Sequence, residues 1–464
     1  MVTLFEGLRS AANALEAMAE ALATTQMNMT NAGVTGYARR NVHLRVDGFD
    51  PTRGLPGGVR GSSLSARSQY AEQAVWSQTS QKGFFDSFTQ SANGVDHVLG
   101  LDDVTGRTGI RAALSDLFQS FANLRLGSTD PVNQQNVVEK AQALALTTFQ
   151  TADFLQQSLA TAQSRIQATV DQVNSLVNAA QQWNAQLNAG AQADPMAEAQ
   201  VYINLETLST LVPITVQKES NGGLTILLNG QEALLQGSQQ FPLSISFATP
   251  ESSANFPNAP AQLRIRNAAG EDITSSITAG ELGGLLDYSN RFLPSLLGDS
   301  NQQGDLNRLA QGIANSVNSA LGGPQPMFQF DGNPVNRARS LQLSSSFTRE
   351  DLAAAIMANP SALVDLAGIA GGVKPTDQID GQSYSAFLVS LSSRAAASLN
   401  TVSDGLNLQS RLVDQAQAFR ETVQGASVEQ SAVELLQYQR AFEAAAKVIR
   451  IIDDLTLTTI NMVR

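Results

Sequence analysis

The chain of 464 residues contains no cysteine, so disulfide bonds and sites that need a thiolate are excluded. This composition suits a protein that crosses or occupies an oxidising space. Only two histidines are present, His43 and His97, and neither has a plausible set of metal ligands near it in the sequence. Aromatic residues reach 6% and charged residues 15%, both low values. We therefore expect no metal and no cofactor.

Sequence motifs of catalysis are also missing. We find no phosphate-binding P-loop, no dinucleotide fingerprint and no nucleophile elbow. The acidic pairs Asp102-Asp103 and Asp453-Asp454 are most simply solvated helix faces or caps rather than a general acid and base. We expect no catalytic or cofactor-binding residues, and hence no enzyme.

Charge and hydropathy limit the partners. The net charge of −12 leaves no basic stripe for a nucleic acid. No apolar run approaches the ~18 residues of a membrane span, and the N-terminus lacks the pattern of a cleaved signal peptide. These signals alone predict a soluble, cytoplasmic protein. The length predicts two to four domains.

The C-terminal run from Ser427 to Arg464 has neither glycine nor proline and carries a heptad pattern. One series recurs every seven residues and a second series lies three places after its members: Val428, Leu435, Phe442, Ile449, Thr456 and Val463, then Tyr438, Ala445, Ile452 and Thr459. The pattern predicts a long helix that buries one stripe against another helix. Ser427 and Gln430 predict a capping box at its start.

A matching stripe lies near the N-terminus, where apolar residues again fall seven apart: Leu8, Leu15, Leu22 and Met29. Two amphipathic helices at the chain ends predict an antiparallel pair that closes the chain into a loop. An ordinary helical core whose ends happen to pair fits the periodicity equally well.

Between the ends, the run from Val132 to Ala189 also lacks glycine and proline. Asp130 is a good N-cap and Pro131 suits the first helical position, so one long helix is predicted. Further helices are expected over Ser65 to about Ser91 and, after a capping box formed by Thr278 and Glu281, over Glu281 to Leu297. Another is expected over Gln382 to about Gly425, with weak points at Gly405 and Gly425.

After residue 210 the sequence pattern changes from helical to strand-like. Ile214 to Val216 and Leu224 to Leu228 flank a glycine turn, and Leu243 to Phe247 and Leu263 to Arg266 alternate with period two. The predicted fold is mainly α, an elongated multidomain rod of long antiparallel helices built from the N- and C-terminal parts, with an inserted β-rich domain. The expected domains are residues 1–64 with 426–464, residues 65–210 with 279–425, and residues 211–278.

The segment after the first helix resembles a motif of flagellar axial proteins, Ala-Asn-x-x-Thr-Pro-Gly-Tyr-x-Arg. Asn31, Gly36, Tyr37 and Arg39 match it, whereas Thr35 occupies the proline place. The C-terminal stretch from Leu435 to Phe442, with Leu436, Gln437 and Tyr438, is similar to the ending of the family of the first flagellar hook-associated protein, FlgK.

The resemblance implies a structural adaptor at the hook–filament junction that is exported to the flagellum without a cleaved signal peptide. The implied partners are further copies of the chain, the hook protein, the next hook-associated protein and an export chaperone on the C-terminal helix. The expected assembly positions are the two stripes: Leu8, Leu15, Leu22 and Met29 with Leu435, Phe442, Ile449 and Ile452.

Other function classes stay open at this point. A hook or distal rod protein would share the C-terminal helix, although the uninterrupted helix from Val132 to Ala189 disfavours a hook-type, β-rich middle. Flagellin fits less well because the turn from Asn31 to Tyr37 is not its pattern. An intracellular coiled-coil scaffold is allowed by the periodicity alone.

Overall fold

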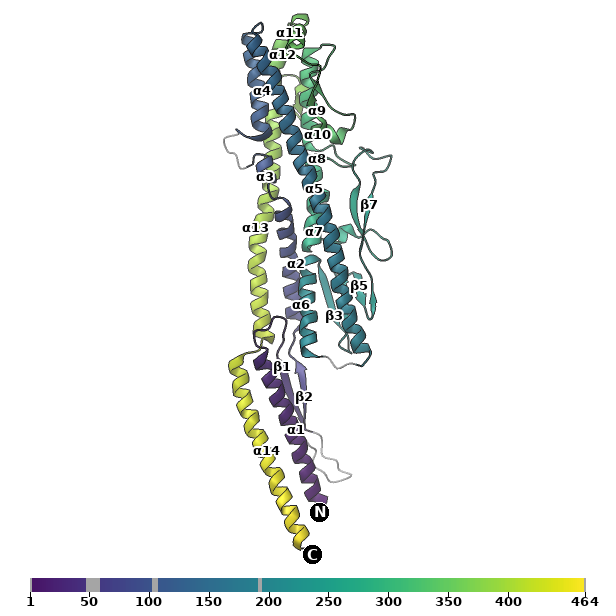
Figure 1. Cartoon of the computed structure of the whole chain (residues 1–464), viewed down its shortest axis with the longest axis vertical. Helices are drawn as coiled ribbons and strands as arrows, with labels where there is room; N and C mark the ends of the chain where they lie inside the picture. Colours follow the sequence, from purple (N-terminus) through teal and green to yellow (C-terminus); the bar gives the residue numbers. More distant parts are fainter. Residues whose placement is uncertain (1, 47–58, 102–106, 191–193, 463–464) are drawn as a thin grey trace.

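The computed structural model describes residues 2–46, 59–101, 107–190 and 194–462. The molecule is elongated, with a long helical rod above and a slimmer terminal part below that carries both chain ends (Figure 1). The sequence prediction of a mainly α, elongated molecule with long antiparallel helices is therefore confirmed. The acidic pair Asp102-Asp103 and the heptad residue Val463 lie outside the described residues.

The terminal part contains two helices and a ribbon. Helix α1 (Val2–Thr30) climbs from the N-terminus, and α14 (Val428–Met462) descends beside it to the C-terminus, so the pair is antiparallel (Figure 1). Strands β1 (Arg40–Val46) and β2 (Val59–Ser65) form an antiparallel ribbon that packs on α1. At the start of α14, the Ser427 hydroxyl accepts a hydrogen bond from the Gln430 amide at 3.4 Å, one half of the expected capping box.

The rod is built on the longest helix, α5 (Pro131–Asn188), which is uninterrupted as predicted. Its N-cap Asp130 accepts from the Val132 amide at 2.9 Å, and Pro131 occupies the first turn. Helix α4 packs along α5, α13 packs along α2, and α6 contacts both α2 and α5. The bounds of these helices are α2 (Gln69–Ser91), α4 (Gly109–Leu126), α6 (Pro195–Leu211) and α13 (Tyr384–Gln424).

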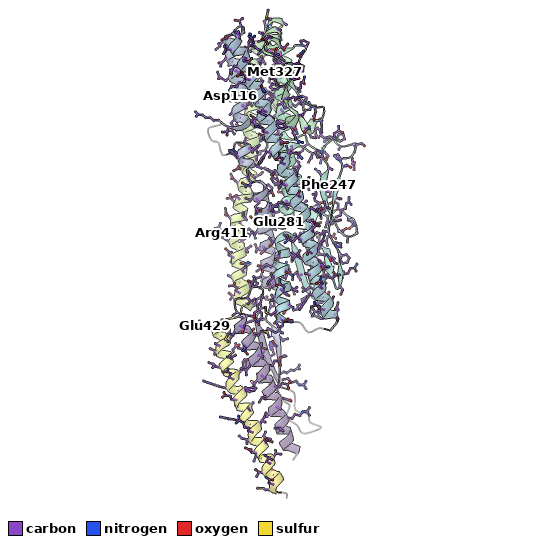
Figure 2. The ribbon with its side chains drawn as sticks, viewed as in Figure 1. Asp116, Phe247, Glu281, Met327, Arg411 and Glu429 are labelled. Carbon is purple, nitrogen blue, oxygen red and sulfur yellow. The ribbon has the colours of Figure 1, made fainter. Side chains whose placement is uncertain are left out.

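A four-stranded antiparallel sheet in the order β3-β4-β5-β6 lies against the lower part of the rod. The side chain of Asn184 on α5 donates to the Leu224 carbonyl at 2.7 Å and accepts from the Leu224 amide at 2.8 Å, which fixes the sheet to the helix. A separate ribbon pairs β7 with β8, and Phe247 lies exposed on it (Figure 2). The strands are β3 (Ile214–Lys218), β4 (Leu224–Leu228), β5 (Glu232–Gln236), β6 (Gln239–Gln240), β7 (Ser244–Ala248) and β8 (Gln262–Arg266).

The remaining elements cover the upper rod. The helices are α3 (Val95–Val98), α7 (Gly280–Asp287), a π-helical turn (Tyr288–Phe292), α8 (Leu293–Leu297), α9 (Asp305–Leu321), α10 (Arg337–Ser340), α11 (Arg349–Ala358) and α12 (Ala362–Ile369). Three 3-10 turns (Thr274–Ser276, Pro334–Asn336, Pro375–Asp377) and two small ribbons complete the set: β9 (Phe328–Gln329) with β10 (Gln342–Leu343), and β11 (Gln378–Ile379) with β12 (Gln382–Ser383).

One continuous hydrophobic core runs through the rod and the sheet, from Trp76 to Val402 in the sequence. Its largest fully buried side chains are Trp76, Tyr288 and Tyr384. No described residue of α1 or α14 belongs to this core. The terminal pair is therefore held by its own, thinner packing.

Two local sequence expectations are wrong. Thr278 forms no capping box, because the helix begins at Gly280 after Ala279, and no side chain caps it. Gly280 has φ +76°, and an added Cβ would lie 2.4 Å from the Leu211 carbonyl oxygen, so close backbone packing sets this start. Gly405 is no weak point, since α13 continues through it and the Phe85 ring fills the space that a Cβ would take, 2.5 Å away.

In the part of the chain that the structure describes, no single helix has the length and apolarity for a membrane crossing, although α11 and α12 reach both as a bent pair.

Candidate assembly interface

The predicted stripes lie on the facing sides of the terminal pair without being fully buried. The expected assembly positions on both helices are all half-buried: Leu8, Leu15, Leu22, Met29, Leu435, Phe442, Ile449 and Ile452. The Ile452 side chain lies against α1 at Gly7, where an added Cβ would be 3.5 Å from its Cδ1. Their role between copies of the chain stays a prediction.

Sequence periodicity places Thr25 on the N-terminal stripe but misses the rest of the most buried face of α1. This face consists of small and polar residues: Ala17, Ala21, Thr24, Thr25 and Asn28. The ribbon packs closely here, because an added Cβ on Gly61 of β2 would lie 3.2 Å from the Ala17 carbonyl oxygen. The sequence signal for this buried face was its alanines, Ala17 and Ala21. Alanine permits close backbone approach but adds little to an apolar pattern.

Helix α14 has a second apolar stripe that nothing in the described chain covers. Its large members are between 47% and 81% exposed: Val433, Leu436, Val448, Ile451, Leu455 and Met462. A helix with two apolar stripes normally buries both, so this face is available to another protein surface. Among the residues of the family motif, Leu436 and Gln437 are exposed and Tyr438 is half-buried.

The turn after α1 explains the pattern Thr35-Gly36-Tyr37. The Tyr37 amide donates to the Val34 carbonyl at 3.1 Å, and Gly36 has φ +79°, which is the pattern of a type II turn with glycine in its third position. Proline is favoured in the second position of that turn, and here Thr35 takes it. An added Cβ on Gly36 would lie 2.7 Å from the Ala199 carbonyl oxygen, so the turn packs directly on α6.

Asn28, near the end of α1, ties the helix to the strand that follows the turn. Its Oδ1 accepts from the Tyr37 hydroxyl and from the Arg40 amide, both at 2.8 Å, and its Nδ2 donates to the Arg40 carbonyl at 2.8 Å. Burial raises the pKa of Tyr37, so the phenol stays a donor at neutral pH. Asn31 donates to the Met27 carbonyl at 3.0 Å and so ends the helix.

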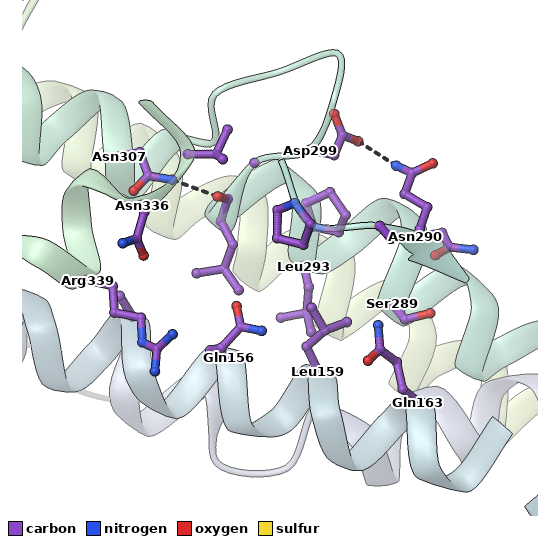
Figure 3. A pocket seen from close by; sticks show the side chains of 18 residues that line it. Gln156, Leu159, Gln163, Ser289, Asn290, Leu293, Asp299, Asn307, Asn336 and Arg339 are labelled. Carbon is purple, nitrogen blue, oxygen red and sulfur yellow. Dashed lines mark hydrogen bonds between the residues drawn. The ribbon is translucent and has the colours of Figure 1, made fainter. Parts of the chain in front are cut away.

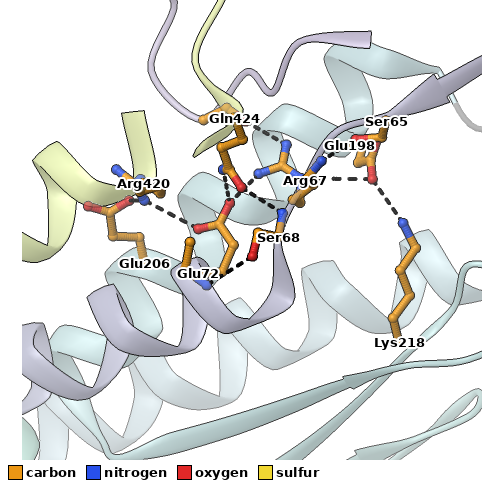
Figure 4. A network of polar contacts seen from close by, with 11 residues as sticks. Ser65, Arg67, Ser68, Glu72, Glu198, Glu206, Lys218, Arg420 and Gln424 are labelled. Carbon is orange, nitrogen blue, oxygen red and sulfur yellow. Dashed lines mark hydrogen bonds and ion pairs between the residues drawn. The ribbon is translucent and has the colours of Figure 1, made fainter. Parts of the chain in front are cut away.

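Where the terminal part meets the rod, a buried polar network forms a joint (Figure 4). Arg67 is its first hub: it pairs with Glu72 at 2.5 Å and donates to the Gly36 carbonyl of the turn at 2.7 Å. The guanidinium also lies 3.7 Å from the ring centre of Tyr202 on α6. The side chains of Arg67 and Glu72 are only 5% and 2% exposed, so this pair is shielded from solvent.

Gln424, the last residue of α13, is the second hub. Its Nε2 donates to Glu72 Oε1 at 2.7 Å, its Oε1 accepts from the Ser68 amide at 2.8 Å, and its carbonyl accepts from the Arg39 amide at 2.9 Å. Arg420 adds ion pairs to Glu206 at 2.6 Å and to Glu72 at 3.3 Å. The joint thereby connects α2, α6, α13 and the turn, all distant in sequence.

Two cavities of the described chain lie in the rod and beside the joint. A cavity of about 50 Å³ in the rod is lined by residues of α5, the π-helical turn, α8, α9, α10 and neighbouring loops, among them the amides of Gln156 and Asn307 and the side chain of Leu293 (Figure 3). A cleft of about 550 Å³ lies beside the joint, between the turn and the end of α13. Among the described residues no three His, Asp or Glu side chains gather as metal ligands would.

Comparison with known families gives two matches. Residues 95–323 match the family model of the flagellar hook-associated protein FlgK helical domain. Residues 424–462 match the C-terminal model of the flagellar basal body rod FlgEFG proteins. The first match covers α3 to α9, and the second covers α14.

Relatives agree with these matches. Flagellar hook-associated protein 1 of Bacillus subtilis is 24% identical over an alignment covering 99% of both chains. Flagellar hook-associated protein 1 of Escherichia coli is 25% identical over 62% of this chain and 52% of its own length. The solved flagellar hook junction protein FlgK from Burkholderia pseudomallei shares 21% identity and a TM-score of 0.47, covering 56% of this chain and 47% of its own.

Proposed function

The chain belongs to the family of flagellar hook-associated protein 1, FlgK, with a structural role at the hook–filament junction, and we propose that it fills this role by assembling through α1 and α14. Members of this family assemble with other flagellar components. The proposed neighbours are further copies of the chain, the hook protein on one side and the next hook-associated protein on the other.

The observation that carries the proposal is the unequal packing of α14. One stripe of this helix packs on α1, whereas the second stripe exposes side chains such as Ile451 at 59% and Leu455 at 51%. Burying these side chains between copies contributes about 25 cal/mol for each Å² of apolar surface removed from water. The terminal pair lies outside the main core, so such burial adds to the packing of α1 on α14 and on the ribbon.

The same exposed stripe supports an export chaperone as a further partner. Before assembly, an apolar face on a long helix is an aggregation hazard, and a chaperone that covers α14 removes it. In this proposal the chain is exported without a cleaved signal peptide, and its final location is the extracellular flagellum.

Deleting residues 428–464 in the native organism tests the function. Intact hooks with flagellin shed into the medium support a junction protein whose last helix is the assembly element. Missing hooks place the protein with the hook or rod components, and unchanged flagella contradict a role in the flagellum.

A further inference from the structure

A polar notch of about 220 Å³ opens where the ribbon meets the start of α14. Arg39 and Asn41 line it from the ribbon side, and Gln430, Glu434 and Tyr438 line it from α14. The notch belongs to neither the buried joint nor the exposed apolar stripe. It contains Arg39, the residue of the family motif that the preceding contacts leave unexplained.

Arg39 is fixed by its backbone but has no partner for its side chain. Its amide donates to the Gln424 carbonyl and its carbonyl accepts from the Ala66 amide, both at 2.9 Å. The Nε atom is fully buried without an acceptor, and no acceptor for the guanidinium is found among the described residues. Nε itself is closed to an incoming group, but Arg39 is only half-buried and lines the notch, so the outer nitrogens of its guanidinium can pair with an acceptor supplied from outside.

The neighbouring arginines show the contrast. Arg40 donates from Nε to the Ser63 hydroxyl at 2.8 Å and from Nη2 to the Ser63 carbonyl at 2.9 Å. Arg67 donates from its Nη atoms to Glu72 and to the Gly36 carbonyl, although its Nε, like that of Arg39, is buried without an acceptor. Arg39 and Arg40 both line the notch, but the Arg40 guanidinium has acceptors within the described chain, whereas none is found there for that of Arg39.

We propose that the Arg39 notch receives a carboxylate of the pair Asp453-Asp454 from a second copy of this chain, and this rests on the proposed assembly through α14. The planar guanidinium fork matches a carboxylate better than any other group that a protein surface offers. Asp453 and Asp454 are exposed, and their carboxylates have no partner in the described chain. They are the adjacent acidic pair on the described surface of the terminal helices.

The geometry requires another copy. Ser431, which lines the notch, and Asp454 are separated along one helix by about 35 Å at 1.5 Å per residue, so α14 cannot bend its own aspartates into the notch. Asp454 lies three positions from Ile451 and next to Leu455 on the helix, so it borders the exposed stripe, and contact through that stripe brings its carboxylate close to the neighbour.

Glu434 also lines the notch and limits what can enter. Its Oε1 already accepts from Gln430 Nε2 at 2.8 Å. In the notch, the Glu434 carboxylate is therefore already hydrogen-bonded to the Gln430 amide, whereas the Arg39 guanidinium has no acceptor among the described residues. An incoming aspartate must meet the Arg39 side of the notch, which gives the contact a defined register.

The absence of cysteine makes a direct test possible, because engineered cysteines have no background. Asn41→Cys marks the rim of the notch, and Thr458→Cys marks α14 one turn beyond Asp454; both positions are exposed. Flagella carrying the double variant are isolated, oxidised and examined for disulfide-linked multimers. The matched control combines Asn41→Cys with Arg411→Cys on the rod, also an exposed position.

The expected result is a ladder of multimers for the first pair and none for the control. Adding Arg39→Gln, or Asp453→Asn with Asp454→Asn, is expected to lower the cross-linked fraction about tenfold. The reversed pair Arg39→Glu with Asp454→Arg is expected to restore it. Thermal unfolding of the purified Arg39→Gln chain that matches the parent excludes a folding defect.

Two outcomes overturn the inference: incorporated flagellar protein that forms no ladder, and a ladder that Arg39→Gln leaves unchanged. Failure of the cysteine variant and of the unmodified chain to enter flagella at all overturns the proposed function instead. Incorporation is measured separately, by the amount of the chain in isolated flagella, so the two failures are distinguished.

Discussion

The side-chain amide of Gln424 donates to Glu72 Oε1 at 2.7 Å, and this bond joins the last residue of α13 to the first turn of α2. The same residue accepts from the Arg39 and Ser68 amides. The side chain of Gln424 thus joins α13 to the start of α2, and its backbone carbonyl joins α13 to Arg39, directly ahead of β1. The orientation of the terminal helices relative to the rod depends on this joint.

Replacing Gln424 by alanine is expected to loosen the joint. The change leaves the buried Ser68 amide without its acceptor and removes a donor from Glu72, which costs about 1–3 kcal/mol. Small-angle X-ray scattering of the purified chain is expected to show a broader distribution of long distances. Glu421→Gln, at an exposed position three residues earlier, is the control and is expected to scatter like the parent.

Thr35→Pro is expected to stabilise the chain by about 0.4–1 kcal/mol, because Thr35 sits in the turn position that favours proline and the substitution restricts the unfolded chain. Urea unfolding followed by circular dichroism measures the change. Val34→Pro moves the same restriction one position earlier and is expected not to stabilise. A destabilised Thr35→Pro variant would contradict the assignment of the turn.

Gly405→Ala is expected to destabilise the rod, because the new methyl group meets the Phe85 ring at 2.5 Å and the ring must shift. The matched variant is Gly368→Ala in α12, where the nearest atom is 3.7 Å away. That second variant is expected to gain up to about 1 kcal/mol from helix propensity. Opposite shifts in the urea midpoint are the expected result, and equal shifts would refute the close contact.

Ile451 and Ile452 are neighbours on α14 with different surroundings. Ile451 is 59% exposed, whereas Ile452 lies against Gly7 of α1. Ile451→Asp is expected to keep the helix content of the purified chain and to block its incorporation into flagella. Ile452→Asp is expected to lower the helix content as well, since it separates α14 from α1. Normal incorporation of Ile451→Asp would contradict assembly through the exposed stripe.

The half-buried stripes of α1 and α14 give a second prediction about assembly. Phe442→Asp or Ile449→Asp is expected to abolish assembly while the rod, with its separate core, stays folded. Limited proteolysis that leaves a stable fragment close to residues 70–390 would support this. Leu408→Asp, at an exposed position on α13, serves as the control for adding one charge to a long helix.

Alkaline pH is expected to destabilise the rod through two buried tyrosines. Burial raises the pKa of both Tyr202 and Tyr288 from 10.0 to about 12. The unfolded chain loses these protons from pH 10 upward while the folded chain still holds them, so the stabilisation is present below pH 10 and is lost as the pH rises through about 12. Urea unfolding at pH 9 and at pH 11 measures the loss, and Tyr288→Phe is expected to reduce it.

The sequence by itself determined the helical framework. Long runs without glycine or proline and with apolar residues at three- and four-residue spacing leave a helix as the favourable local structure, so α5, α13 and α14 follow the predicted bounds closely. The cap at Asp130 follows from local chemistry as well, because the side chain and the amide that it accepts from are two residues apart. The family resemblance also rests on sequence alone, on the segment from Asn31 to Arg39 after α1 and on the stretch from Leu435 to Phe442 in α14.

The contacts of the joint, and which faces of the helices are buried, depend on the tertiary structure alone. Gln424, Glu72 and Arg67 meet because distant helices converge, and no spacing in the sequence reveals such an encounter. Gly405 is predicted from the sequence as a weak point, yet Phe85 packs where its side chain would be, and Leu211 occupies the corresponding space at Gly280, where α7 begins. Which stripe of α14 stays uncovered likewise depends on where α1 lies. Local patterns fix helices because their hydrogen bonds are local, whereas contacts between elements are fixed by packing.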